Sequence, residues 1–488
     1  MFDGFLRVAA ATPDIRVADC NFNGASAAAL VSEAYEQGVS LLVLPELCLT
    51  GYTCSDLFLQ ESLLDGAGKA LLTLTEATRD KNMVVLAGLP LTVNGVLYNV
   101  AAVLHDGDIL GFVPKSYLPT YSEFYEGRHY HSGADIEADV LFNGKTYPFG
   151  TRLLFRCRQM PAFTLGIEIC EDLWVAQPPS ISHALAGATV IANLSASDET
   201  TGKDIYRRSL VSGQSARLVC GYIYADAGEG ESSTDLVFGA HNLICENGSI
   251  LTESERFSNQ MIMADMDMSK LISERRRMTT WQPKFDNGYR VIDFDLEMHE
   301  VDLRRFIDPH PFVPDDAMDR TRRCEEILTI QAMGLKKRLA HTHCRHAVVG
   351  ISGGLDSTLA LLVTVRAFDM LDMDRSQIMA VTMPCFGTTD RTYHNACELV
   401  RRLGATLEEV DIKEAVTLHF SDIGQDPANH DVTYENGQAR ERTQVLMDIA
   451  NRLGGMVIGT GDMSELALGW ATYNGDHMSM YGVNASVP

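Results

Sequence analysis

A glycine-rich turn constrains the fold of this chain more than any other feature. The apolar run HAVVGI leads directly into Ser352-Gly353-Gly354, and an apolar helix is expected from Leu355 to about residue 368. Glycines let the backbone curl so that N–H groups and the helix N-terminus face an anion. No lysine closes the loop, so it differs from the Walker pattern GxxxxGK(S/T). This order predicts a parallel α/β sheet that binds a nucleotide at the end of the strand, although a plain capped turn would also explain the glycines.

The pattern of apolar and charged residues divides the chain into three parts. Over 1–270, short apolar runs that read as strands alternate with helix-like stretches, which predicts a layered α/β domain. Residues 271–320 are charged and then proline-rich, and we expect them to form a linker. Residues 321–488 again alternate strand-like and helix-like patterns, which predicts a second, parallel α/β domain.

The composition excludes several classes of function. The formal net charge of -25 would repel phosphate backbones, so we expect no nucleic-acid partner. No apolar run reaches the ~18 residues of a membrane span, and the first residues lack the pattern of an export signal, so we expect no membrane association. The 11 cysteines form no CxxC pair, which indicates reduced thiols and a cytoplasmic protein.

Three apolar segments of the first domain each end in a reactive side chain. LLVLPELCLTGY contains Glu46, GDILGFVPKSYLP contains Lys115 and FTLGIEICEDLW contains Cys170. Hydrolysis of an amide without a metal needs a nucleophile, a base and a positive group for the oxyanion, and these three residues supply those roles. Each residue alone is weak evidence, because most such Glu and Lys side chains are solvated and most cysteines are inert core residues.

Together, however, PELCLTGY, VPKSYLPTYSEFYE and GIEICEDLW resemble the glutamate, lysine and cysteine motifs of the nitrilase superfamily. This resemblance implies an αββα sandwich. The segments EFYE and NLSASDETTGKDIYRRSL are similar to the glutaminase domains of NAD+ synthetases, in which Glu123 or Glu126 would assist the nucleophile. The same resemblance implies a glutamine site made of Tyr121, Phe124, Glu171, Ser197 and Lys203. Tyr121 and Phe124 could equally be ordinary packing aromatics.

The second domain resembles the synthetase domain of the NAD+ synthetase family in MPCFGTTDRTYHNA, ENGQARERTQVL and GTGDMSELALGWATYNGDHMSMYGVNASVP. This resemblance implies a Rossmann-like ATP pyrophosphatase-type domain with a pyrophosphate loop. Carried over residue by residue, it implies an ATP site of Ser352, Gly353, Gly354, Asp356, Ser357 and Thr460, a deamido-NAD+ site of Asn436, Arg440 and Glu465, and Mg²⁺ ligands Asp356 and Glu465. Two carboxylates suit Mg²⁺, which prefers oxygen ligands.

The resemblance implies glutamine-dependent NAD+ synthesis. Glutamine would be hydrolysed to glutamate and ammonia, which with ATP would amidate deamido-NAD+ and release AMP and pyrophosphate. We expect Mg²⁺, no prosthetic group and a large homo-oligomer. The chain stops at Pro488 where the family continues, so we expect the second domain to be incomplete at its C-terminus. The alternatives are another ammonia-using pyrophosphate-loop amidotransferase and a non-catalytic nucleotide-binding module.

Overall fold

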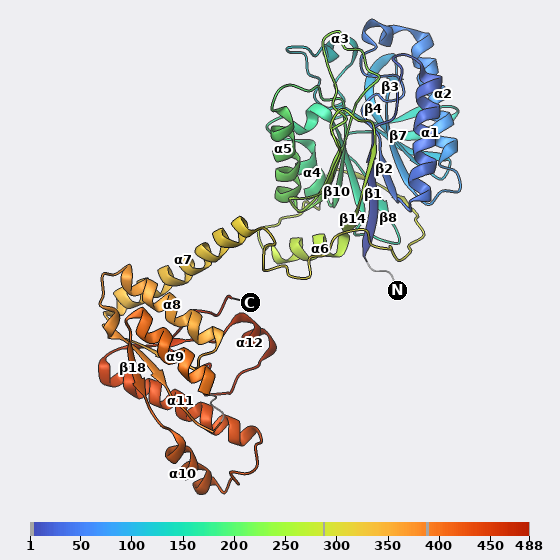
Figure 1. Cartoon of the computed structure of the whole chain (residues 1–488). Helices are drawn as coiled ribbons and strands as arrows, with labels where there is room; N and C mark the ends of the chain where they lie inside the picture. Colours follow the sequence, from blue (N-terminus) through green and yellow to red (C-terminus); the bar gives the residue numbers. More distant parts are fainter. Residues whose placement is uncertain (1–3, 286–287, 387–389, 488) are drawn as a thin grey trace. The chain divides into compact units, whose positions relative to one another are not determined.

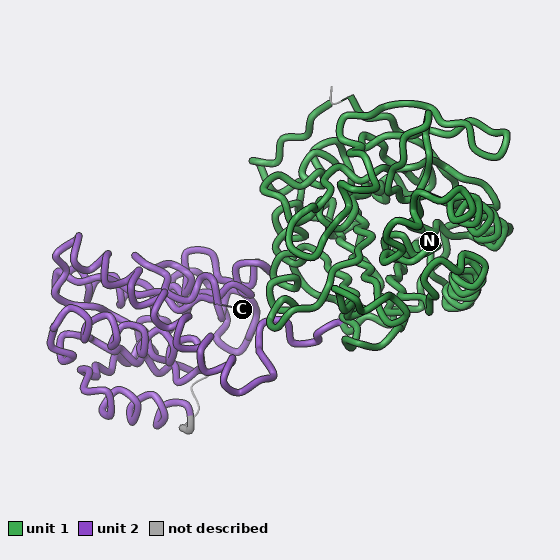
Figure 2. Tube along the Cα trace, turned by 90° about the horizontal axis from the view of Figure 1, so that it is seen from above, with its two compact units in different colours: residues 1–306 green, residues 307–488 purple. Residues whose placement is uncertain are grey.

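The computed structural model describes residues 4–285, 288–386 and 390–487. The chain forms two compact units, Met1–Phe306 and Ile307–Pro488 (Figure 2). No helix in the described residues is both long enough and apolar enough to cross a membrane.

The first unit contains two sheets in its described part. In spatial order, one sheet consists of β14 (Met261–Asp267), β1 (Phe5–Ala11), β2 (Leu41–Val43), β3 (Val84–Val93), β4 (Val96–His105), β5 (Asp108–Pro114), β7 (Lys145–Gly150) and β6 (Glu137–Phe142). The other consists of β13 (Ser249–Glu253), β12 (Leu243–Glu246), β11 (Gly221–Asp226), β10 (Val190–Ser195), β9 (Thr164–Ile169), β8 (Leu153–Cys157) and β15 (Arg290–Phe294). The helices are α1 (Cys20–Glu36), α2 (Glu61–Ala77), α3 (Glu126–His129), α4 (Pro179–Leu185), α5 (Lys203–Leu218) and α6 (Met268–Arg277), with 3-10 turns η1 (Ser55–Leu59) and η2 (Cys170–Leu173).

Alternation of side chains along the strands produces the layers of this unit. In β2, Leu41 and Val43 belong to the core between the sheets, whereas Leu42 belongs to the core beneath α1 and α2. A third core packs Val211 of α5 and Ala184 of α4 on the outer face of the second sheet. Figure 1 shows α1 and α2 flanking the sheets on one side and α4 and α5 on the other. The predicted αββα sandwich is confirmed.

Part of the segment expected to be a linker packs on the first unit. Strand β15 pairs in parallel with β8, from Arg290 opposite Leu153 to Phe294 opposite Cys157. Arg305 then donates to both carboxylate oxygens of the buried Glu246, at 2.6 and 2.9 Å. The first unit therefore extends to Phe306, because these residues add a strand and a buried ion pair to it.

The second unit contains a five-stranded sheet in its described part, with every neighbouring pair parallel. Its spatial order is β18 (Thr406–Glu409), β17 (Ile378–Thr382), β16 (Ala347–Gly350), β19 (Met456–Gly459) and β20 (Tyr481–Gly482). The helices are α7 (Ala317–Thr342), α8 (Leu355–Asp369), α9 (Asp390–Leu403), α10 (Lys413–Ile423), α11 (Val432–Leu453) and α12 (Met463–Leu468), with a 3-10 turn η3 (Arg375–Gln377).

Helices cover both faces of this sheet. Val349 of β16 lies in a core with α7 and α8, whereas its neighbour Val348 lies in a core with α10 and α11. Both faces of the central strand are therefore buried, as in doubly wound parallel sheets. The predicted parallel α/β fold of the second domain is confirmed.

Candidate functional site

Glu46 lies in a tight turn just after β2. The turn packs on β3 so closely that a Cβ at Gly88 would lie 2.2 Å from the Leu47 nitrogen, which explains the glycine. The Glu46 carboxylate is buried. Its Oε1 accepts from Lys115 Nζ at 2.7 Å and from Asn99 Nδ2 at 2.6 Å, and its Oε2 accepts from the Ala196 backbone N–H at 3.0 Å. These bonds fix the carboxylate in one orientation.

Lys115 follows β5 and is fully buried between two carboxylates. Its ammonium donates to Glu46 and, at 2.6 Å, to Glu126 Oε1. Burial acts to lower the pKa of Lys115, but the charges of Glu126 and Glu46 outweigh burial and raise it well above its usual value. Lys115 therefore stays positive, as an oxyanion partner must.

Glu126 is the acidic residue of the EFYE segment that joins the cluster. Its Oε1 also accepts from the Tyr52 hydroxyl at 2.8 Å. Burial, together with the charge of Glu46, raises the pKa of Glu126 to about 7, while Lys115 acts in the opposite direction. Glu123, the alternative, is half-buried and lines the wall of the neighbouring pocket.

Cys170 begins η2 directly after β9, with a positive φ of 44° that is unusual for a residue other than glycine. Burial and the charge of Glu46 raise the pKa of its thiol well above the usual value, and Lys115 opposes them. The structure thus brings Cys170 within the electrostatic reach of both Glu46 and Lys115. Because the resting thiol is protonated, its attack on a carbonyl requires a base that removes the proton as the bond forms.

A buried carboxylate that the sequence reasoning did not select ties two of these segments together. Asp172 Oδ1 accepts from the backbone N–H groups of Ser116 at 3.1 Å and Tyr117 at 2.9 Å, next to Lys115. Its Oδ2 accepts from the Ile169 N–H at 2.9 Å, next to Cys170. Asp172 therefore sets the spacing of the lysine and cysteine segments. Its position two residues after the cysteine was the available sequence signal.

Four of the five predicted glutamine residues form a chain of contacts beside Cys170. The Tyr121 hydroxyl donates to Glu171 Oε1 at 2.9 Å, and the Tyr121 and Phe124 rings meet edge to face at 6.1 Å. The Lys203 ammonium lies 5.8 Å from the centre of the Phe124 ring and pairs with a carboxylate of Asp198. An aromatic wall with one anion and one cation can recognise an amino acid.

Ser197, the fifth, is held by another network. Its N–H donates to Asp226 Oδ1 at 2.8 Å, and its hydroxyl accepts from the buried Arg207 at 3.2 Å. Ser197 is therefore bonded to the charged residues Asp226 and Arg207. None of the four residues of the contact chain is among these hydrogen-bond partners.

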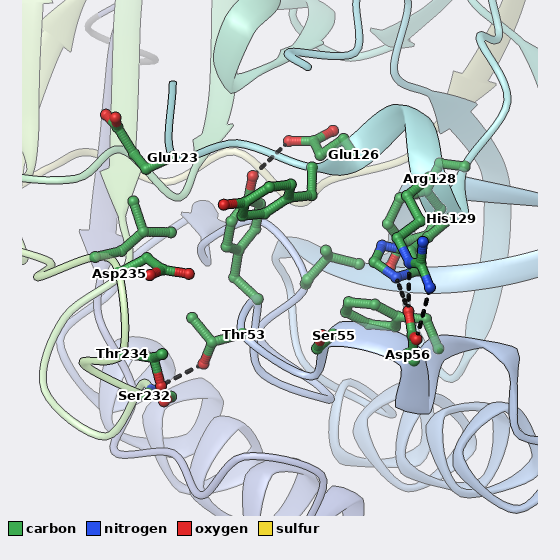
Figure 3. Close-up of a pocket in the computed structure, with 16 residues that line it drawn as sticks. Thr53, Ser55, Asp56, Glu123, Glu126, Arg128, His129, Ser232, Thr234 and Asp235 are labelled. Atoms are coloured by element: carbon green, nitrogen blue, oxygen red, sulfur yellow. Dashed lines mark hydrogen bonds and ion pairs between the residues drawn. The ribbon is translucent and has the colours of Figure 1, made fainter. Parts of the chain in front are cut away.

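A pocket of about 430 Å³ adjoins the charged cluster, with Glu126 on its wall (Figure 3). Thr53 and Ser232 lie at one end, and Asp56, bound by Arg128 and His129, lies at the other. Two of its buried polar atoms, Glu126 Oε2 and the Tyr130 hydroxyl, lack a hydrogen-bond partner among the described residues. The pocket can thus take a small polar molecule in contact with Glu126.

In the second unit, the predicted anion loop joins β16 to α8. Gly353 has φ +86°, and a Cβ there would lie 2.1 Å from the Thr392 carbonyl oxygen, so only glycine fits. The Ser352 hydroxyl accepts from the Gly354 N–H at 3.2 Å, and Ser357 Oγ donates to the Gly354 carbonyl at 3.2 Å. The loop is thus braced by its own serines at the N-terminus of α8.

Asn484, another residue that sequence reasoning missed, joins this loop to the end of β19. Its Nδ2 donates to the backbone carbonyls of Asp356, at 2.9 Å, and Thr460, at 3.0 Å. Burial raises the pKa of Glu465, and the charges of Asp462 and Asp356 contribute. The two predicted metal ligands therefore lie close enough to repel each other. No group of three or more His, Cys, Asp or Glu side chains that could hold a metal occurs in the described residues.

Asn436 and Arg440 lie one turn apart on α11. Asn436 Oδ1 accepts from the Thr472 hydroxyl at 2.9 Å, and Arg440 Nε donates to the Tyr473 carbonyl at 3.2 Å. Both therefore meet the segment after α12. Their described hydrogen bonds do not reach the glycine-rich loop.

Comparisons with known proteins identify both units. The carbon-nitrogen hydrolase family model matches residues 7–276, and the NAD synthase model matches residues 327–482. A glutamine-dependent NAD(+) synthetase of Mycobacterium tuberculosis is 45% identical over 500 residues, covering 99% of this chain and 74% of the relative. One from Thermotoga maritima is 29% identical, covering 98% of this chain and 78% of the relative. A solved glutamine-dependent NAD(+) synthetase structure from Cytophaga hutchinsonii covers 97% of this chain and 78% of its own, at 23% identity and a TM-score of 0.49.

The two family models and the relative from Mycobacterium tuberculosis confirm the resemblance inferred from the motifs. The chain belongs to the glutamine-dependent NAD(+) synthetase family.

Proposed function

We propose that the first unit hydrolyses the side-chain amide of glutamine at Cys170 and that the second unit uses the ammonia and ATP to amidate deamido-NAD+. One observation supports the first half most strongly. Lys115 is buried in contact with both Glu46 and Glu126, and all three interact electrostatically with the Cys170 thiol. A nucleophile, a base and a permanent cation are therefore combined in one buried site.

The chemical course follows from these positions. Glu46 takes the thiol proton as Cys170 sulfur attacks the amide carbonyl, and Lys115 stabilises the oxyanion. The tetrahedral adduct collapses to a thioester as ammonia leaves with the proton from Glu46. Glu46 then activates water to release glutamate and restore the thiol.

Recognition of glutamine is assigned to the contact chain beside Cys170. The Glu171 carboxylate suits the α-ammonium group and the Lys203 ammonium suits the α-carboxylate, while Tyr121 and Phe124 flank the methylene groups. Ser197 contributes from the Arg207 network. These roles are supported by the contacts between the four side chains.

In the second unit, the loop Ser352-Gly353-Gly354 and Ser357 bind the ATP phosphates, with Thr460 alongside. Mg²⁺ would be held by Asp356 and Glu465, whose mutual repulsion a divalent cation would relieve, and it would supply charge neutralisation at the phosphates. Asn436, Arg440 and Glu465 face deamido-NAD+. Its nicotinate carboxylate attacks the α-phosphorus, pyrophosphate leaves, and ammonia displaces AMP.

Replacing the nucleophile tests the first half. Cys170→Ala should reduce glutamate release to the background rate, because no other group forms the thioester. Cys245→Ala, a buried cysteine in β12 on the outer face of the second sheet, is the matched control and should retain the wild-type rate. Glutamate release by Cys170→Ala at the rate of this control would refute the assignment.

Replacing a metal ligand tests the second half. Glu465→Gln should weaken the Mg²⁺-dependent part of ATP binding and leave glutamate release unchanged, since the two reactions use separate residues. Glu414→Gln, on the exposed start of α10, is the control. Unaltered Mg²⁺-dependent binding in Glu465→Gln would remove Glu465 from the metal site.

Location and assembly are part of the same proposal. The cysteine composition supports a cytoplasmic protein with reduced thiols, and the family resemblance supports a homo-oligomer. Light scattering on the purified chain tests the assembly: a strictly monomeric mass at micromolar concentration would contradict it.

A further inference from the structure

A buried chain of polar side chains lies behind Cys170, on the three neighbouring strands β9, β10 and β11. It consists of Asn193, Tyr222 and Glu168, all almost wholly inaccessible to solvent. Glu168 and Asn193 stand opposite each other in the parallel register of β9 and β10. None of the three belongs to the charged cluster around Lys115 or to the contact chain that we assign to glutamine. Three polar side chains buried in sheet positions therefore need an explanation.

The hydrogen bonds of this chain run in a single direction. The Cys170 backbone N–H, which can only donate, faces Asn193 at 3.1 Å, so the facing atom is the amide oxygen Oδ1. The other end of that amide is then the donor Nδ2, which donates to the Tyr222 hydroxyl oxygen at 3.2 Å. The phenol proton must therefore point onward, to Glu168 Oε1. Burial raises the pKa of Tyr222 well above its usual value, so the phenol keeps this proton.

Glu168 ends the chain as an acceptor. Its second oxygen accepts from the Ser180 backbone N–H at 2.8 Å, at the start of α4, and the Ser180 hydroxyl accepts from Gln214 of α5 at 2.9 Å. A carboxylate can accept on both oxygens, whereas an amide at this position would present a donor to one of its two neighbours. An acceptor at Glu168 therefore favours the observed orientation of the Asn193 amide, whose Oδ1 also accepts from the Ser195 hydroxyl at 2.7 Å.

We infer that Glu168 is a positioning residue, which holds the peptide group of the nucleophile in its strained conformation through Tyr222 and Asn193. The positive φ of Cys170 is an unfavourable conformation that contacts with the surrounding structure have to maintain. The hydrogen bond from the Cys170 N–H is one of these contacts. If the side-chain amide of Asn193 rotated by half a turn, its Nδ2 would face the Cys170 N–H. Both groups are donors, so the hydrogen bond would be lost. The peptide would then rotate and move the thiol relative to Glu46. The inference rests on the proposed role of Cys170 and adds to it.

The first test removes one hydroxyl from the chain. Tyr222→Phe keeps the ring but deletes the two hydrogen bonds by which the phenol joins Asn193 to Glu168. We expect kcat for glutamate release to fall about tenfold, because small displacements of reacting groups cost rate, while KM stays within about twofold since glutamine contacts are untouched. Alkylation of Cys170 by iodoacetamide should slow by a similar factor. A purely structural role would lower the unfolding midpoint without this kcat and KM split.

The matched control is Tyr147→Phe, which deletes the hydroxyl of another buried tyrosine, one that donates to the Asp108 carboxylate at 2.9 Å, outside the chain. It should leave kcat, KM and the alkylation rate unchanged. Wild-type kcat in a folded Tyr222→Phe, or an equal loss in the control, would overturn the inference.

The second test asks whether Glu168 acts through Tyr222. Glu168→Gln should lower kcat with KM retained, and the double variant with Tyr222→Phe should lose no more than the worse single variant, because both changes break one chain. Additive losses would contradict the inference. If Glu168→Gln fails to fold, Tyr222→Phe decides alone. Cys170→Ala separates the two proposals: activity in that variant refutes the proposed function, whereas an inactive Cys170→Ala beside a normal Tyr222→Phe refutes only the positioning role.

Discussion

The two candidate sites differ in how much of their electrostatics is complete before a substrate binds. In the first unit, Glu46, Lys115 and Glu126 are all buried, and Lys115 is bonded to Glu46 at 2.7 Å and to Glu126 at 2.6 Å. In the second unit, Asp356 is exposed, and Glu465 is engaged in capping α12 through the Asp462 N–H. The first site is preorganised by charge pairing. The second offers a braced loop with two carboxylates that form no ion pair within the described part of the chain.

This difference matches the substrates proposed for each unit. Glutamine is small, and the reaction at its amide is favoured by charges that are already fixed in a buried site. A nucleotide carries its own phosphate charges and a metal, so an open site lined with donors and carboxylates can be completed by the ligand. Substitutions in the two sites should therefore affect stability and activity in different proportions.

The largest effect should come from removing the buried cation. Lys115→Met leaves Glu46 and Glu126 facing each other without compensation, which should cost about 3–5 kcal/mol of unfolding free energy. Glutamate release should fall by ~10²–10³ because the oxyanion loses its partner. Urea unfolding and a glutamate assay measure both. Lys145→Met, which breaks an exposed pair with Asp108, is the control and should cost under about 1 kcal/mol. Equal losses of unfolding free energy in the two variants would contradict the view that the first site is preorganised by charge pairing.

In the second unit the next effect should appear in ligand binding. Gly353→Ala would force a Cβ against the Thr392 carbonyl oxygen at a positive φ, so the loop has to shift. We expect ATP affinity to fall about tenfold or more, for a strain of ~1–3 kcal/mol. The control is Gly454→Ala, which shares a positive φ but has open space around its Cβ. Gly454→Ala is strained as well, but it lies outside the loop, so ATP affinity should stay unchanged. A titration with a fluorescent ATP analogue measures the affinity of both variants.

The sequence predicted those parts of the sites that have a local signature. Glu46, Lys115 and Cys170 follow strands in recognisable segments, and the structure brings them together; the strand-loop-helix at Gly353 was predicted with its helix starting at Leu355. The sequence did not show which of the two acidic residues of EFYE, Glu123 or Glu126, assists the nucleophile. Only the fold shows that Glu126 turns inward, because its partner Tyr52 comes from a different loop.

Other residues were missed because long-range pairing determines their neighbours. Asn99 lies mid-strand in VLYNVAAVLH and reads as an ordinary polar interruption; the antiparallel pairing of β4 brings its amide to Glu46. Asn193 and Asn484 are single amides whose partners are backbone groups of distant segments. Residue type and spacing carry no information about such partners.

The next prediction concerns pH. Glu126 has a pKa of about 7 in the folded protein, above the ordinary 4.5. Below 4.5 it is protonated in both states, and between the two values only the folded state binds the proton, so its contribution to stability is lost as pH rises from about 4.5 to about 7. Glu126→Gln should flatten this part of the stability profile. Urea unfolding at several pH values measures the difference, with Glu123→Gln at the pocket wall as control. An unchanged slope would show that the cluster does not hold this proton.

The smallest effect should come from the rim of the glutamine site. Tyr121 is 57% exposed, and its hydroxyl donates to Glu171 at 2.9 Å. Partial burial and the hydrogen bond to Glu171 raise the pKa of Tyr121 to about 12, so the phenol remains a donor at neutral pH. Tyr121→Phe removes one hydrogen bond to a charged acceptor near solvent, worth about 1 kcal/mol.

Because that bond orients Glu171 and lies outside the reacting cluster, KM for glutamine should rise about threefold to tenfold while kcat stays unchanged. Tyr125→Phe, on a neighbouring and similarly exposed tyrosine, is the control and should alter neither constant. Initial rates over a range of glutamine concentrations give both values. A fall in kcat at constant KM would mean that the Tyr121 and Glu171 pair acts on the bond-making step, and the division between a preorganised centre and a binding rim would not hold.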